Sequence, residues 1–269
     1  MGHTRLGAVP KTRKWTEIVE QVAGSPVEGG GVAVSLSDID WIAARTLDAT
    51  QSGLEKASKD PGVRYTFYLL TQIALASRSP AWKDLLGKLG IRLTEDSTVF
   101  EFTAEVHDAV DRYLNDTLAG TSDVGEMAQQ AAGEAIASLA GTRTPNLFGT
   151  MGVEVQDTIR SLSTKKGFGE LGQRFFGRFV ARFLNFYLSR VTAATLGSPR
   201  LQQLGDVARF NDALKVHCDQ SARIVRDFCG EWYSKTEYQE GIDADNSSRF
   251  LAVALQKLRN ELEKQKADS

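Results

Sequence analysis

One segment, residues 165–191, constrains the fold of this chain more than any other. On a helix, with about 100° between successive residues, its aromatic side chains cover one very wide arc. The arc contains Phe168, Phe175, Phe176, Phe179, Phe183, Phe186 and Tyr187. A narrow stripe outside this arc carries Arg174, Arg178 and Arg182. A surface helix buries only one stripe, so this helix either runs through the middle of a helical domain or inserts into another apolar environment.

The rest of the chain also has helical patterns. Residues 98–118 place apolar side chains on one face of a helix and acidic side chains on the other. Residues 125–141 have alanine at most apolar positions, and small side chains let neighbouring helices approach closely. Residues 205–232 and 247–262 carry further apolar stripes, and no segment alternates as a strand would. We therefore predict an all-α fold of about eight helices, in one multi-helix domain or in two packed helical halves.

Glycine, proline and polar residues divide the chain into segments. Thr12 is a suitable N-cap for a first short helix, and Pro61 a suitable first residue of another. The predicted segments are a basic N-terminal arm with a short helix (1–24), a glycine-rich flexible loop (25–36), an N-terminal helical half (37–141), a linker (142–152) and a C-terminal helical half (153–269).

Composition excludes several broad classes. The 32 basic and 34 acidic residues give a net charge of −2, which disfavours general nucleic-acid binding. No apolar run reaches the roughly 18 to 20 residues of a membrane-spanning helix, and no secretory signal begins the sequence. Two cysteines are too few for a disulfide framework. We expect a cytoplasmic protein with reduced thiols.

Few residues suggest catalysis or metal binding. His107 and Asp111 have the spacing of two ligands on one helix, but nothing marks a third ligand. Cys218 and Cys229 fall within the apolar stripe of the predicted helix 205–232, as buried thiols do, and His217 lies beside that stripe. The common nucleophile, zinc and dinucleotide motifs are absent. We therefore predict no catalytic residue, no metal site and no cofactor.

The arginine stripe is the strongest candidate contact. Between residues 165 and 190 there are six basic residues and one acid, Glu170. On one interpretation, Arg174, Arg178 and Arg182 belong to a central helix and reach solvent or pair with carboxylates, such as those of residues 98–118. On a second, the helix lies at a membrane surface, with its arginines at lipid headgroups. On a third, the arginines bind a phosphate or an acidic partner.

Two other regions are candidate contact surfaces. The first fifteen residues are basic and contain no acid, so they form either a strap over the domain or an arm that binds a partner. Their basic residues are Arg5, Lys11, Arg13 and Lys14. A polar connection after the helix 205–232 contains aromatic side chains, a combination enriched at protein interfaces. Its candidate contact residues are Trp232, Tyr233, Lys235 and Tyr238.

These patterns favour a non-enzymatic interaction or regulatory subunit of a larger cytoplasmic assembly, with another protein as its partner. Two alternatives remain open. One is a peripheral protein that binds an anionic membrane surface through the Phe/Arg-rich helix 167–191. The other is an enzyme with a site assembled around His107 or His217, because catalytic groups can come together from distant parts of a sequence. The sequence leaves the oligomeric state open.

Overall fold

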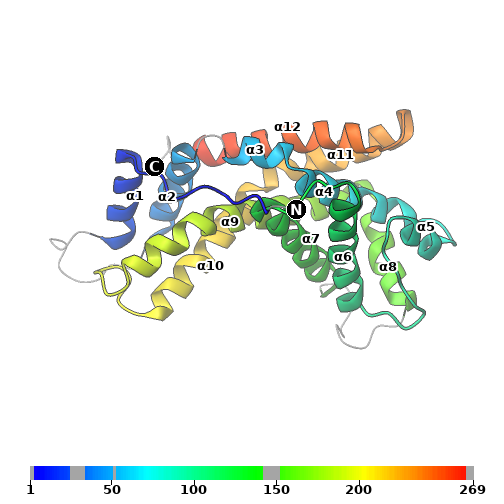
Figure 1. Cartoon of the computed structure of the whole chain (residues 1–269), viewed down its shortest axis with the longest axis horizontal. Coiled ribbons are helices and arrows are strands. Elements are labelled where there is room, and N and C mark those ends of the chain that lie inside the picture. Colours follow the sequence, from blue (N-terminus) through cyan, green and yellow to red (C-terminus); the bar gives the residue numbers. More distant parts are fainter. Residues whose placement is uncertain (1–2, 25–33, 51–52, 142–151, 265–269) are drawn as a thin grey trace.

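The chain forms an all-α structure, shown in a computed structural model that describes residues 3–24, 34–50, 53–141 and 152–264 (Figure 1). The helices are α1 Arg13–Ala23, α2 Leu36–Ala49, α3 Gly53–Lys59, α4 Pro61–Ala76, α5 Trp82–Lys88, α6 Val99–Asp116, α7 Asp123–Gly141, α8 Gly152–Leu162, α9 Lys165–Ala194, α10 Leu204–Ser221, α11 Arg223–Gln239 and α12 Ala244–Lys264. The predicted number of about eight is too low, since the described residues form twelve helices.

Local sequence explains where many helices begin. The side chain of Thr12 caps α1 as predicted, and Asp60 caps α4, which has Pro61 in its first turn. The sequence also offers Ser37 or Asp38 as a cap for α2, but this helix begins two or three residues earlier than either would place it. Ser35 is the N-cap there, and Asp38 completes a capping box by accepting a hydrogen bond from the backbone of Ser35.

Two of the extra helices arise where predicted helices are divided. A continuous helix over 205–232 is wrong, because Ala222 separates α10 from α11. The sequence has no glycine or proline at this break to predict it. The carbonyl of Ala222 accepts a hydrogen bond from the amide of Val225, three residues on, which is a tighter spacing than in an α-helix. Similarly, α2 ends at Ala49 and α3 begins at Gly53, where the sequence favours one helix.

Helix α9 lies at the centre of the molecule and packs against α7, α10 and α11 (Figure 1). The aromatic arc is in the core: of its seven side chains only Phe186 is partly exposed, and the other six are buried. The interpretation as a central helix is therefore confirmed. Phe67 from α4 lies against this cluster, with its ring centroid 5.5 Å from that of Phe176. Such offset and tilted aromatic contacts add to the free energy of apolar burial.

The two predicted halves are packed against each other. Helix α9 of the C-terminal half contacts α7 of the N-terminal half, and α12 contacts α2, α3 and α4. Most of the predicted loop 25–36 and nearly all of the predicted linker 142–152 lie outside the described residues. Among the described helices, none combines the length and the apolarity needed to cross a membrane.

The N-terminal arm is a strap. It runs from the side of α4 and α7 to α1, across the body of the molecule (Figure 1). Thr4 forms an isolated parallel bridge with Ser122, and the Leu6 amide donates to Asp123 Oδ2 at 2.7 Å. The imidazole of His3 also binds Asp123, at 2.6 Å. Leu6 and Val9 pack against the core, so the arm is part of the fold.

Candidate functional site

The polar stripe of α9 lines a groove between α7 and the helices α10 and α11. Three neighbouring pockets make up this groove, which we call the α9 groove, with volumes of about 510, 210 and 350 Å³ along α9 from its N-terminal side. The first contains Arg174, the second contains Arg178 and Arg182, and the third shares Arg182 with the second. The third pocket is lined by α7 and α9 alone and also contains the acids Asp123 and Glu126. The groove therefore brings the whole predicted arginine stripe onto one surface.

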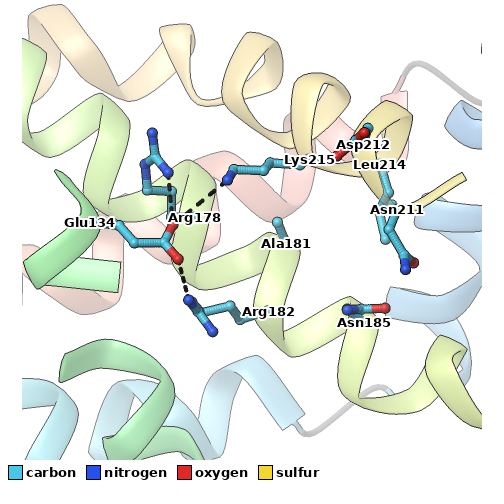
Figure 2. Close-up of a pocket in the computed structure, with 9 residues that line it drawn as sticks. All are labelled: Glu134, Arg178, Ala181, Arg182, Asn185, Asn211, Asp212, Leu214 and Lys215. Carbon is cyan, nitrogen blue, oxygen red and sulfur yellow. Dashed lines mark hydrogen bonds and ion pairs between the residues drawn. The ribbon is translucent and has the colours of Figure 1, made fainter. Parts of the chain in front are cut away.

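In the middle pocket, three cations surround one carboxylate (Figure 2). Arg178 Nη1 donates to Glu134 Oε2 at 2.7 Å, and Arg182 donates to Glu134 Oε1. From α10, Lys215 Nζ lies 3.8 Å from Glu134 Oε2. The carboxylate that pairs with the arginines thus comes from α7, so the expected pairing with residues 98–118 is wrong.

The cations keep Glu134 ionised. Burial alone would raise its pKa, but the hydrogen bond from Arg178 and the charges of Arg182 and Lys215 outweigh burial, so the pKa of Glu134 lies below its usual range. One negative charge therefore faces three positive charges in this cluster. Asp212 also lines the pocket, so its five charged residues leave a net charge of +1. Arg178 is the most enclosed cation, with 11% of its side chain exposed, whereas half of Lys215 is exposed.

The opposite end of the middle pocket is lined by two amides, Asn185 from α9 and Asn211 from α10 (Figure 2). The Oδ1 atoms of both side chains are buried, and no group in the described part of the chain donates a hydrogen bond to either. A buried carbonyl oxygen without a donor is unfavourable. The middle pocket thus combines excess positive charge at one end with two unused acceptors at the other.

At the N-terminal end of the groove the charges are more balanced. Arg174 Nη1 lies 3.7 Å from Asp219 Oδ2, and Gln173 donates to the backbone carbonyl of Asp219 at 3.1 Å. Val216, a half-exposed apolar side chain, lines the same pocket beside Arg223. Charged groups around an exposed apolar residue are typical of the surfaces that bind other proteins.

The predicted aromatic connection is not a loop, because α11 continues to Gln239 and contains all four of its candidate residues. Tyr233 is fully buried and stacks on Phe168 with their ring centroids 4.2 Å apart. Trp232 is partly buried and stacks on Phe250. Only Lys235 and Tyr238 of the four are exposed, so most of this aromatic surface belongs to the core.

The basic residues of the arm are not gathered into one patch. Lys14 pairs with Asp48 at 2.9 Å, and Arg13, which is 93% exposed, lies near Glu17. Lys11 is exposed, and Arg5 lines a separate pocket beneath the strap. The structure therefore does not bring these four residues together with the arginine stripe.

The histidines and cysteines do not assemble a reactive site among the described residues. His107 is half-buried and lies near Gly133, while Asp111 accepts from Gln129 at 3.0 Å. Within the described ranges, no group of three His, Cys, Asp or Glu side chains could hold a metal ion. Both cysteines are fully buried, and burial raises the pKa of each thiol far above neutrality.

His217 has a more specific setting. Its Nδ1 lies 2.8 Å from Asp40 Oδ1 of α2, and its Nε2 is buried with no hydrogen-bond partner in the described structure. Burial lowers the pKa of His217, against the opposing effect of the Asp40 charge. His217 is buried, and none of the five pockets described here contains it.

Comparisons with protein-family models, with curated proteins and with solved structures each find no match to this chain. Function is therefore inferred from the chemistry of the α9 groove. Sequence patterns identified its arginines, and Asn185 falls on the same stripe of the helix, but they missed Glu134, Lys215 and Asn211. Gln130 and Glu134 are four residues apart in an alanine-rich helix and therefore lie on the same face. This polar pair is the sequence feature that could have predicted a contact with the arginines of α9.

Proposed function

We propose that this chain is a non-enzymatic interaction or regulatory subunit of a larger cytoplasmic assembly, and that it binds an acidic segment of another protein along the α9 groove. One observation carries the proposal: three cations converge on the single carboxylate of Glu134 in a pocket that solvent reaches. The remaining positive charge would attract and orient a partner of opposite charge.

The shape and composition of the groove support a protein partner. The stripe from Arg174 to Ser189 spans fifteen residues of helix, or about 22 Å at 1.5 Å per residue. This length suits an extended segment or a helix better than a single small molecule. Arginine beside exposed apolar groups such as Val216 is common where proteins bind one another.

The test is a tagged pull-down from the native host with the wild-type chain and two charge reversals. Lys215→Glu changes an exposed groove residue, and Arg13→Glu makes the same kind of change on α1. We expect a stoichiometric partner that Lys215→Glu loses and Arg13→Glu retains, with both variants as stable as the wild type. Loss with Arg13→Glu alone would place the contact on the arm, and a wild-type chain without a partner would overturn the proposal.

The membrane alternative has less support, because the aromatic arc of α9 is buried in the core and is not available to lipid in this conformation. It predicts flotation with anionic liposomes that high salt abolishes. The enzyme alternative predicts a ligand-induced rise in the melting temperature. The pair of His217 with Asp40 is the arrangement closest to an acid–base site, but His217 lines no described pocket.

A further inference from the structure

The middle pocket of the α9 groove is built around a carboxylate that belongs to the chain itself. We infer that this pocket binds a carboxylate with a neighbouring N–H donor, as found in an aspartyl or glutamyl residue, and that Glu134 holds its place until the ligand arrives. The inference rests on the proposed function, because it supplies the chemistry by which the groove would anchor its acidic partner.

The cationic end of the pocket is suited to a carboxylate. Arg178 and Arg182 contact different oxygens of Glu134, so together they form a two-point site for one planar carboxylate. Lys215 adds a third charge from a separate helix. Because these groups keep an excess positive charge with Glu134 in place, a second carboxylate at the pocket is attracted as well.

Glu134 can leave this position without opening the core. About a third of its side chain is exposed, and it projects from α7 into the pocket (Figure 2). A change of side-chain rotamer would move its carboxylate away from the three cations. The three cations would then be free to bind the carboxylate of a ligand. Glu134 therefore competes with that ligand and lowers its affinity.

The amide end of the pocket supplies the second half of the recognition. Asn185 and Asn211 each have a buried Oδ1 atom without a donor among the described residues. Because neither oxygen is open to solvent, each amide must turn towards the pocket before an N–H group of the ligand can donate to it. A backbone amide of a peptide or the ammonium of a free amino acid can supply that donor. A simple anion without a donor, such as inorganic phosphate, meets only the cationic end.

The test titrates three probes into the full-length chain and follows arginine and asparagine side-chain N–H resonances by NMR. The probes are aspartate capped by acetyl and N-methylamide groups, the equally capped asparagine, and free aspartate. We expect capped aspartate to shift the resonances of Arg178, Arg182 and Asn185, and capped asparagine to leave them unchanged. Tighter binding of free aspartate than of capped aspartate would identify a free amino acid as the source of the carboxylate.

Two kinds of variant sharpen the test. Glu134→Gln removes the internal competitor and keeps the side-chain shape, so capped aspartate should bind about tenfold more tightly. The control Glu55→Gln removes the same charge from α3, outside the groove, and should leave binding unchanged. Asn211→Ala should weaken binding by about fivefold through loss of one hydrogen-bond acceptor.

The outcomes separate this inference from the proposed function. If neither the wild type nor Glu134→Gln binds capped aspartate, or if both bind capped asparagine equally well, the carboxylate site is wrong. The proposed function would still stand if Lys215→Glu lost the protein partner. If probes bind as expected but no partner depends on Lys215, the pocket is a carboxylate site and the subunit proposal fails.

Discussion

Helix α9 meets its neighbours through two contacts of opposite kind. Towards α11 it presents Gly169 and Gly172. We call these two residues, together with Gly230 of α11, the glycine seam. A Cβ atom at these positions would lie 2.7 Å from the Arg226 carbonyl oxygen, 2.5 Å from Cys229 Sγ and 2.4 Å from the Lys165 carbonyl oxygen, respectively. Towards α7 and the polar side of α10 it presents the long arginines of the α9 groove, and only Gly177 packs closely on Asp219 of α10 among the glycines of that side.

The difference shows which contact can change without loss of the fold. At the seam the backbones of two helices touch, and a single added carbon atom must displace a carbonyl group or a buried sulfur. In the groove the contacts are made by side chains, which range from the enclosed Arg178 to the half-exposed Lys215, and an exposed ion pair contributes little to stability. We therefore expect the seam to contribute most to stability, and the exposed part of the groove to be free to determine binding.

The largest effect is expected from Gly169→Ala. Alanine favours a helix over glycine by about 1 kcal/mol, but its methyl group would collide with the Arg226 carbonyl of α11. We expect a net loss of about 2–3 kcal/mol in the free energy of unfolding, measured by urea denaturation.

Gly205→Ala is the matched control. A Cβ atom added at Gly205, in the first turn of α10, meets nothing within 4 Å. This variant should be unchanged or more stable, by up to about 1 kcal/mol. Equal stability of Gly169→Ala and the wild type would show that α9 and α11 separate easily, and the contrast between the two contacts would disappear.

A smaller loss is expected from Arg178→Glu. Arg178 is the best enclosed of the groove cations, and the substitution would place a second carboxylate beside Glu134. We expect a loss of about 2 kcal/mol in the free energy of unfolding, because repulsion replaces a partly buried ion pair. Arg13→Glu, at a position 93% exposed, should change stability by less than about 0.5 kcal/mol. If both substitutions changed the free energy of unfolding equally, the ion pair of Arg178 would contribute no more to stability than that of an exposed surface residue.

The contact between α2 and α10 should weaken in acid. Burial lowers the pKa of His217 in the folded protein, and a protonated Nε2 would have no acceptor in the described structure. In the unfolded chain the pKa of histidine is about 6.5, so below that pH the unfolded state binds more protons than the folded state. The contribution of His217 to the free energy of unfolding is fully present above about pH 6.5. It decreases as the pH falls from there towards the pKa of His217 in the folded protein.

Urea denaturation between pH 5 and 7.5 measures this dependence. His217→Gln removes the titrating group and retains a side chain that can contact Asp40. We expect the wild type to lose more stability than His217→Gln as the pH falls, with His3 and His107 present in both proteins. Parallel pH profiles would contradict a neutral His217 in the folded state.

The sequence predicted the central helix well, for a physical reason. The wide aromatic arc of α9 must be hidden from water, so the sequence predicts either a central helix or one inserted into another apolar environment. The packing of α7, α10 and α11 around α9 decides for the central position. The extension of α11 was missed because its last turns are polar. Tyr233 and Thr236 lie on the buried side of those turns, and tertiary packing keeps the segment helical where local preference favours a loop.

The site was predicted only in part. Arginine spacing on one helix identifies a stripe, because positions four residues apart share a face. Which carboxylate faces that stripe depends on helix packing, and the partner proved to be Glu134 rather than an acid of α6. The amide pair of Asn185 and Asn211 comes from two helices whose register the sequence does not reveal.

The smallest effect on stability is expected from Lys215→Glu. Half of this side chain is exposed, and its nitrogen is 3.8 Å from Glu134, so the variant should stay within about 0.5 kcal/mol of the wild type in urea denaturation. The same substitution reverses a charge at the groove entrance and should abolish capture of an acidic partner. If this variant unfolds at the same urea concentration as the wild type but loses its partner, the groove residue Lys215 contributes to binding and not to stability. If Lys215→Glu instead destabilised the protein as much as Gly169→Ala, the groove would be a structural contact like the seam.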